Sequence, residues 1–254
     1  GDWMAALEGS TAVINLVGRS VNCRYTERNK EEIIASRVNA TRVIGYAIKA
    51  AVRPPEVWIN AGSAAIFGDT GEEQMDEASA PGEGFSPEVC KKWEAAFYSI
   101  DTPFTRKVVL RMGLVFQKDE GLLKPFSRLV RLGLGGKMGS GEQYMSWIHE
   151  EDFTGLVAAI VDNGDWEGII NGVSPYPVKN KDFLKALCSA YNIGFGLPQP
   201  AFLLRLGALL IGTEAELILS GRRVVSKVLE KKNFQFSYPR LEDALRQLIT
   251  RSHF

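Results

Sequence analysis

Two side chains with ionisable groups lie one helical turn apart in the segment FSPEVCKKWEAAF, residues 85–97. Cys90 supplies a thiol and Glu94 a carboxyl group, and residues four apart share one face of a helix. A carboxylate beside a thiol raises the pKa of the thiol and disfavours the thiolate, which is the nucleophilic form. We therefore interpret Cys90 as a small buried apolar residue rather than a nucleophile.

Two further polar groups invite a chemical interpretation. Ser63 follows a predicted strand, where its hydroxyl could hydrogen-bond a substrate carbonyl or hydroxyl group, although a lone loop serine is usually a turn residue or a cap. Arg222 and Arg223 could hold an anionic substrate through bidentate contacts. A solvated helix face is the commoner setting for such a pair, and it is the one that we expect here.

The segments that must position these groups alternate between strand and helix. Apolar runs rich in β-branched residues are typical of strands buried on both faces of a parallel sheet. Three such runs cover residues 11–17, 56–62 and 106–116. Helical spacing of apolar residues over 26–51, with Thr26 or Asn29 as the cap, follows the first run, and a second helix precedes the third. This order predicts an α/β fold with a Rossmann-like parallel sheet and helices on both faces.

The ends of these strands are where a ligand site is expected. In open parallel sheets, ligands bind at the carboxyl ends of the strands. The residues at that edge are Asn15, Leu16, Val17, Gly18, Asn60, Ala61, Gly62, Ser63, Arg111, Met112 and Gly113. Gly18 and Gly62 would let a ligand approach the backbone closely, or they simply make turns.

The remainder of the chain is mainly helical in pattern. Residues 1–172 form the predicted Rossmann-like domain, with 117–146 contributing to a substrate cleft, and residues 173–254 form a smaller helical domain. The apolar stretch PAFLLRLGALLIG at 200–212 contains an arginine and is too short to span a bilayer. We interpret it as a buried helix and expect no membrane partner.

Composition argues against several functional classes. The 30 basic and 30 acidic residues cancel, and no run of Lys and Arg is dense enough to follow a phosphate backbone, so no nucleic-acid partner is expected. Cys23, Cys90 and Cys188 are far apart and form no CxxC pair, which indicates neither a disulfide framework nor a metal site. A small-molecule ligand and a reducing, cytoplasmic location fit best.

An ordered series of segments carries a family resemblance along almost the whole chain. These segments include SAAIFGDTG, VCKKWEAAF, LRMGLVF, RLGLGGKMGSGEQYMSWIHEEDF, GTEAELILSGRRVVSKVL and FQFSYPRLEDALRQLI. The chain resembles the atypical epimerase-family proteins of the short-chain dehydrogenase superfamily, which carry a helical C-terminal domain of unknown function (DUF1731 type).

The resemblance implies a bound dinucleotide, NADP or NAD, along the strand ends named above, with Glu94 among its contacts. It implies a substrate cleft lined by Trp147, His149 and Arg222, with Asp152 capping the helix that follows. The resulting catalytic candidates are Ser63, Glu94 and His149. By analogy, the protein is a monomer or a homodimer.

Two departures from the family pattern are informative. A GxxGxxG turn that would bind the cofactor pyrophosphate is not found; RLGLGGKMGSG at 131–141 lacks the flanking strand and helix. We therefore expect the chain to start after the first strands, so that these residues alone expose apolar sheet edges and aggregate or require a partner strand. In addition, Cys90 and Glu94 stand where active members carry a Tyr and a Lys. For Glu94, contact with the nicotinamide ribose and exposure on the helix are equally favoured, and acid–base catalysis less so.

Two functions follow from these expectations. The first is an NAD(P)-binding epimerase or oxidoreductase that acts on a small hydroxylated or nucleotide-sugar-like substrate. The second is a noncatalytic dinucleotide-binding protein that regulates or scaffolds a partner. Loss of the Tyr and Lys pair favours the second function, whereas retention of Ser63 and of the segment SWIHEEDF favours an enzyme.

Overall fold

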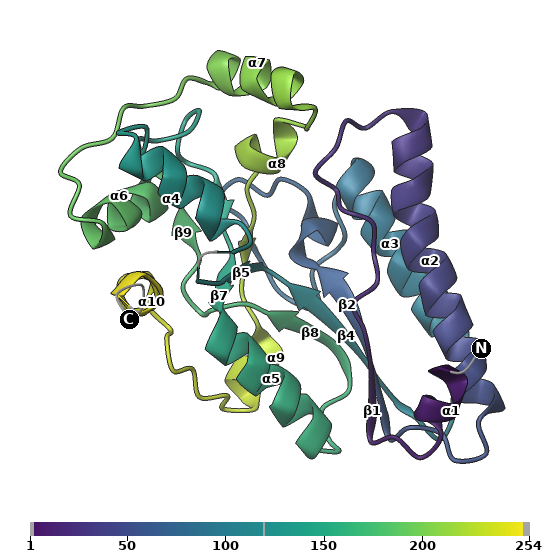
Figure 1. Cartoon of the computed structure of the whole chain (residues 1–254). Coiled ribbons are helices and arrows are strands. Elements are labelled where there is room, and N and C mark those ends of the chain that lie inside the picture. Colours follow the sequence, from purple (N-terminus) through teal and green to yellow (C-terminus); the bar gives the residue numbers. More distant parts are fainter. Residues whose placement is uncertain (1–2, 119, 251–254) are drawn as a thin grey trace.

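A parallel four-stranded sheet forms the centre of the computed structural model, which describes residues 3–118 and 120–250. The strand order is β1-β2-β4-β8, made by β1 (Ala12–Asn15), β2 (Val57–Ser63), β4 (Arg106–Met112) and β8 (Gly168–Gly172). Asn15 pairs with Asn60, and Gly62 pairs with Arg111, so the carboxyl ends of the strands meet at one edge. The predicted Rossmann-like α/β architecture is confirmed (Figure 1).

Helices cover both faces of this sheet. On one face lie α2 (Glu27–Ala50) and α3 (Phe85–Tyr98), and on the other lie α5 (Glu150–Asp162) and α9 (Lys227–Lys231) (Figure 1). Thr26 caps α2 by accepting a hydrogen bond from the Asn29 amide, which decides between the two caps that the sequence left open. Trp58 of β2 packs edge-on against Phe97 of α3, with 4.4 Å between ring centroids, and both side chains are fully buried.

The third predicted strand differs from the structure in its length. Residues 106–116 form two strands, because the chain leaves the central sheet at Gly113. A Cβ atom on Gly113 would come within 2.6 Å of the Ser146 carbonyl oxygen, so this close backbone contact requires glycine. Beyond it, β5 (Leu114–Phe116) pairs in parallel with β7 (Trp147–His149) rather than continuing β4.

The C-terminal helices enclose a second core. The remaining elements are α1 (Trp3–Leu7), η1 (Ala64–Phe67), β3 (Gln74–Met75), α4 (Leu123–Arg131), β6 (Tyr144–Met145), β9 (Val178–Lys179), α6 (Asn180–Ala190), α7 (Ala201–Ile211), α8 (Glu216–Leu219), β10 (Arg223–Val224) and α10 (Leu241–Thr250). Phe126 of α4, Phe183 of α6 and Leu245 of α10 belong to one buried cluster. Between α8 and α10 the chain passes back to the Rossmann-like part, where β10 forms a separate two-stranded sheet with β3 and α9 packs on β8. The division at residue 172 stays a prediction.

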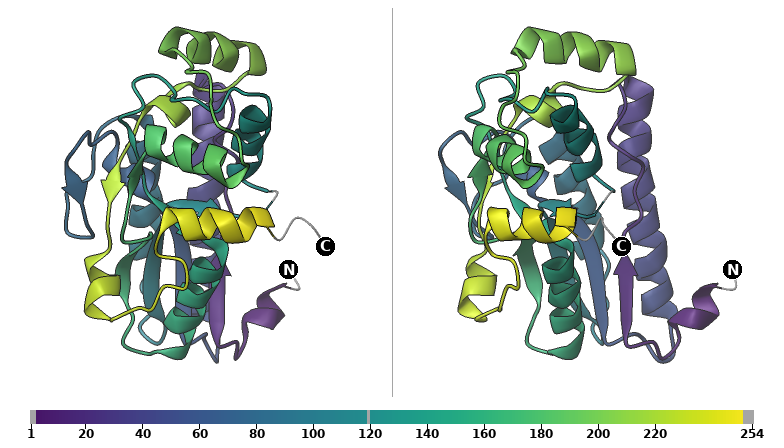
Figure 2. Two further views of the ribbon diagram at one scale, coloured as in Figure 1. Left: turned by 90° about the vertical axis from the view of Figure 1, so that its left-hand side faces the viewer. Right: turned by 60° about the vertical axis from the view of Figure 1, so that its left-hand side comes forward.

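Helix α7 contradicts one expectation. The stretch at 200–212 forms a helix as predicted, but Phe202 is 66% exposed and Leu210 is 78% exposed. Among the described residues, only the side of α7 that carries the buried Ala208 meets the rest of the fold, and the helix lies at one end of the molecule (Figure 2). The prediction of a buried helix was therefore wrong. Within the described ranges, no helix combines the length and apolarity needed to cross a bilayer.

Strand β1 forms one edge of the sheet. Among the described residues it pairs with β2 and with no strand on its other side. Ile14 on this strand and Leu16 just after it are exposed. An open apolar edge of this kind favours pairing with another strand.

Candidate functional site

Buried amides hold the end of β1 in place. Asn15 Nδ2 donates to Asn60 Oδ1 at 2.7 Å and to Thr41 Oγ1 at 3.1 Å, and Trp93 Nε1 donates to the same hydroxyl at 3.0 Å. Asn15 Oδ1 also accepts from the Val17 amide at 3.1 Å. Because buried polar groups must be paired, this network ties β1 and β2 to α2 and α3. The Asn15 side chain therefore holds the carboxyl end of β1 in position.

The residues after Asn15 face outward. Leu16 is 63% exposed and Val17 is 52% exposed. Gly18 lies against α2, because a Cβ atom there would come within 3.0 Å of the Arg37 guanidinium carbon. Of the residues predicted at the end of β1, Asn15 is therefore buried and holds the strand in place, whereas Leu16 and Val17 are accessible.

A buried ion pair joins α3 to the end of β4. Arg111 Nε and Nη2 donate to the two carboxylate oxygens of Glu94 at 2.8 and 2.9 Å. Glu94 is 9% exposed and Arg111 is 4% exposed, so the alternative of an exposed helix carboxylate was wrong. Gly62 leaves room for this arrangement, since a Cβ atom there would lie 3.3 Å from Arg111 Cγ. Arg111 Nη1 is buried and has no hydrogen-bond partner among the described residues.

Cys90 is a buried thiol, as predicted. Burial is the main cause that raises its pKa to about 12, and the nearby Glu94 carboxylate raises it further. Three arginines, Arg37, Arg222 and Arg111, act in the opposite direction. The same arginines give the surroundings an excess of positive charge, because Glu94 supplies one negative charge among them.

This environment predicts a pattern of thiol reactivity. At about pH 8, iodoacetamide should alkylate the partly exposed Cys23 quickly and leave Cys90 unmodified, because the thiolate is the reactive form. Peptide mapping by mass spectrometry measures both rates in one sample, and the same protein in denaturant is the control in which both cysteines react. Equal labelling of Cys90 and Cys23 in the folded protein would show that the Cys90 pKa is not raised.

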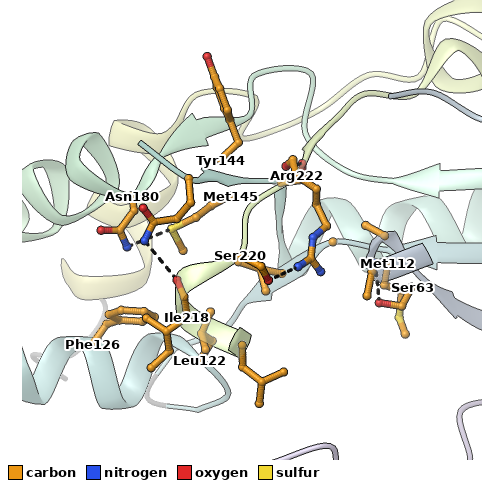
Figure 3. Close-up of a pocket in the computed structure, with 17 residues that line it drawn as sticks. Ser63, Met112, Leu122, Phe126, Tyr144, Met145, Asn180, Ile218, Ser220 and Arg222 are labelled. Atoms are coloured by element: carbon orange, nitrogen blue, oxygen red, sulfur yellow. Dashed lines mark hydrogen bonds between the residues drawn. The ribbon is translucent and has the colours of Figure 1, made fainter. Parts of the chain in front are cut away.

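A cavity of about 140 Å³ opens where the sheet meets the C-terminal helices (Figure 3). Its wall includes four predicted site residues, namely Ser63, Met112, Gly113 and Arg222. The other lining residues are Ala64, Ala65, Leu114, Leu122, Phe126, Gln143, Tyr144, Met145, Ser146, Asn180, Leu217, Ile218 and Ser220. Several of these come from 117–146, the segment expected to contribute to a cleft.

Ser63 has two roles in this geometry. Its Oγ accepts a hydrogen bond from the Ala65 amide at 3.2 Å and so caps the short helix η1. Because accepting leaves the hydroxyl hydrogen unused, Ser63 can still donate to an oxygen atom inside the cavity.

Arg222 lies between α8 and β10, and Arg223 is the first residue of β10, so the expectation of a helix face was wrong for both residues. Its Nη2 donates to Ser220 Oγ at 2.9 Å, and its backbone amide donates to the Tyr144 carbonyl at 3.0 Å. Burial lowers the pKa of the guanidinium. Among the residues that the structure describes, no carboxylate forms an ion pair with Arg222.

Trp147 and His149 lie elsewhere. Both are 0% exposed, and neither lines the cavity. His149 Nδ1 accepts from the Glu151 amide at 3.0 Å and caps α5, so its proton resides on Nε2, 2.9 Å from Gln247 Oε1. Trp147 Nε1 donates to the Tyr176 carbonyl at 3.0 Å. The structure therefore does not bring these two residues together with Ser63.

Asp152 has a different partner from the one predicted. Its carboxylate accepts from the amides of Ser237 and Tyr238 at 2.6 and 3.0 Å. The cap of α5 is His149, so the prediction for Asp152 was wrong. The carboxylate fixes the segment that leads into α10.

Most other cavity residues could not be recognised from the sequence. Leu122, Phe126 and Met145 are apolar, and their periodicity resembles that of any core residue. The Asn15 and Asn60 pair had a usable signal, because an amide inside an otherwise apolar strand requires a buried partner. Across the described residues, no group of three or more Cys, His, Asp or Glu side chains is placed to hold a metal ion.

The fold and the cavity define a Rossmann-like protein with a ligand cavity at the carboxyl ends of its strands, and comparisons with known proteins specify it further. The family described as "Domain of unknown function (DUF1731)" matches residues 199–248. Epimerase family protein SDR39U1 homolog, chloroplastic, from Arabidopsis thaliana is 32% identical over 250 residues, which are 98% of this chain and 71% of that protein. Epimerase family protein YfhF from Bacillus subtilis is 33% identical over 237 residues, 93% of this chain and 77% of its own length. The chain belongs to this epimerase family, as its sequence indicated.

Solved structures agree with this assignment. Human SDR39U1 (isoform 2), crystallised with NADPH, superimposes with a TM-score of 0.90 at 29% identity, covering 98% of this chain and 85% of the human one. A nucleoside-diphosphate sugar epimerase from Corynebacterium glutamicum superimposes with a TM-score of 0.78 at 25% identity, covering 97% of this chain and 47% of that one.

Proposed function

We propose that the protein binds a nicotinamide dinucleotide, NADP or NAD, across the carboxyl ends of β1, β2 and β4. The support is the likeness to the human structure solved with NADPH, together with the surfaces at this edge. Leu16 and Val17 offer exposed apolar surface, and Arg37 beside Gly18 offers a cation. Arg37 forms no ion pair with a described carboxylate, so its charge is available to a ligand phosphate.

The cavity beside these strand ends would hold the substrate. When bound, the dinucleotide supplies or accepts a hydride. Ser63 would donate its free hydroxyl hydrogen to the substrate oxygen and stabilise the negative charge that develops there. The observation that carries this proposal is that Ser63, Met112 and Gly113, each at the end of a central strand, line one cavity.

Glu94 would act here as the counter-ion of Arg111. Because both of its oxygens are already hydrogen-bonded to that guanidinium, a second role as acid and base would break the ion pair. Arg111 then replaces the usual helix Lys as the cation near the cofactor.

A noncatalytic dinucleotide-binding protein is the second candidate. It is favoured by the raised pKa of Cys90, because a thiol with a pKa of about 12 cannot replace the Tyr as a proton donor near neutral pH. The two candidates differ in one observable, which is hydride transfer in the presence of a bound dinucleotide.

Substitution of Ser63 tests the catalytic candidate. We expect Ser63→Ala to lower kcat for carbonyl reduction by about 10²-fold, as loss of an oxyanion donor does elsewhere, and to leave the Kd for NADPH nearly unchanged. NADPH oxidation, followed by absorbance with a panel of carbonyl compounds, gives kcat, and fluorescence titration gives Kd. Ser99→Ala, on an exposed serine, is the matched control. If NADPH binds but no carbonyl compound is reduced, the noncatalytic candidate is correct.

We propose oxidoreductase or isomerase chemistry, a monomer or a homodimer, and a cytoplasmic location. The location is supported by Cys23, Cys90 and Cys188, which are all free thiols.

A further inference from the structure

Arg222 forms no ion pair with a carboxylate of the described residues, although Asp69 and Glu216 act on its charge from beyond ion-pair distance. The guanidinium carries five N–H donors, and Ser220 Oγ is the side-chain acceptor found for it among the described residues. Figure 3 shows the Arg222 guanidinium directed toward Ser220, on the side of the cavity that also carries Ser63. Burying a cation that lacks an ion-pair partner costs free energy, and a ligand anion bound to it would recover part of that cost.

The opposite part of the wall is apolar. Leu122 and Phe126 line the cavity away from Arg222 in Figure 3, and Leu114 and Met145 also belong to its wall. Two polar side chains of this region are already hydrogen-bonded, because Gln143 Nε2 donates to the carbonyls of Met138 and Ile218 and Asn180 Oδ1 accepts from the Met138 amide. This part of the cavity therefore fits a hydrocarbon group better than a sugar ring, whose hydroxyls would require partners.

The size of the cavity limits the ligand further. An apolar cavity of about 150 Å³ holds one benzene molecule, whereas pockets for larger ligands measure about 300–1,000 Å³. The cavity here is about 140 Å³, a size that favours a small ligand over a nucleoside diphosphate sugar.

From these three observations we propose that the substrate is a compact monocarboxylic acid with an apolar body, and not a nucleotide sugar. This proposal rests on the proposed function and names the substrate class of the same site. The carboxylate would bind the planar guanidinium of Arg222 in a bidentate manner, with Ser220 as its neighbour. One guanidinium matches one negative charge, which favours a carboxylate over a phosphate monoester.

The same geometry places the reacting group close to the carboxylate. Ser63 and Arg222 line one small cavity, so a substrate that contacts both has its carbonyl or hydroxyl group only a few bonds from its carboxylate. Short 2-oxo and 2-hydroxy acids with a branched or aromatic side chain meet this requirement.

The test measures ligand binding to the full natural polypeptide by calorimetry, with and without NADPH. The probes are 4-methyl-2-oxopentanoate and phenylpyruvate, the neutral ketone 4-methyl-2-pentanone, and UDP-glucose. We expect at least one acid to bind, and the neutral ketone to bind at least about tenfold more weakly because it lacks the charged group. Failure of both acids to bind, or tighter binding of UDP-glucose, would overturn the proposal.

Two arginine variants make the test specific. Arg222→Gln should weaken binding of the acid by about 10- to 100-fold, as expected for a lost charge-assisted hydrogen bond. Arg246→Gln, on the exposed face of α10, removes the same charge and should leave binding unchanged. Thermal unfolding of both variants checks that they are folded. Unchanged acid binding by folded Arg222→Gln would exclude Arg222 as the anion site.

The outcomes separate this inference from the proposed function. NADPH binding without acid binding overturns the substrate class alone. Acid binding that depends on Arg222 without any NADPH binding overturns the cofactor proposal and keeps the anion site.

Discussion

Replacing Glu94 with alanine is expected to lower the free energy of unfolding by about 3–5 kcal/mol, because it leaves Arg111 as a buried charge without its partner. For a protein of this size, such a loss corresponds to a decrease in Tm of roughly 6–20 °C. Denaturant unfolding followed by circular dichroism measures it. The control is Glu88→Ala on the same helix, whose exposed pair with Lys92 should contribute less than about 1 kcal/mol.

A double replacement examines the cause of that effect. Glu94→Leu combined with Arg111→Met removes both charges and should recover much of the stability lost in Glu94→Ala, since apolar residues often replace buried ion pairs at little cost. A loss below about 1 kcal/mol in Glu94→Ala would contradict the account, because it would mean that water or a ligand reaches Arg111 freely.

Replacing Trp147 with alanine is expected to cost about 3–5 kcal/mol of stability as well, because the indole is fully buried in the C-terminal core. It stacks on Phe116, with 5.5 Å between ring centroids, and its Nε1 hydrogen bond to the Tyr176 carbonyl is lost too. Phe202→Ala, on the exposed α7, is the control and should change stability by less than about 0.5 kcal/mol.

The Trp147 variant also distinguishes a role of this tryptophan in core packing from a role in the substrate cleft. A tryptophan that lined the substrate cleft would change ligand affinity while leaving the free energy of unfolding nearly the same. A stable Trp147→Ala protein with weakened substrate binding would therefore contradict the packing described here.

The fold was predictable where local pattern decides structure. The apolar run that became β2 is buried along six of its seven residues, and that continuous burial is what its β-branched composition indicated. The pattern could not show where the chain leaves the sheet. Gly113 divides the third run because the Ser146 backbone passes close to it, and this contact exists only in the folded chain.

The site was predictable in part, for related reasons. Topology placed Ser63, Met112 and Gly113 at one edge, and they do line one cavity. The partner of Glu94 was not predictable from helical spacing, because Arg111 reaches it from a strand. His149 was singled out because the family resemblance implies that it lines the substrate cleft, yet that resemblance carries no information about the burial of this side chain.

Helix α7 shows that hydropathy alone does not predict whether a helix is buried. Its residues are apolar on nearly every side, which is typical of a buried helix. The structure gives it a contact on one side only, so its burial depends on the number of neighbours and not on its own composition.

The central claim is that a dinucleotide binds along the carboxyl ends of β1, β2 and β4, and one calorimetric titration tests it most directly. NADPH and NADH are each titrated into the full natural polypeptide and into its Arg37→Gln variant, with Arg28→Gln on the exposed face of α2 as the control. We predict saturable binding of one cofactor per chain, with a Kd of about 1 μM to 1 mM, weakened in Arg37→Gln and unchanged in Arg28→Gln. Absence of saturable binding of either dinucleotide to the folded protein would contradict the claim.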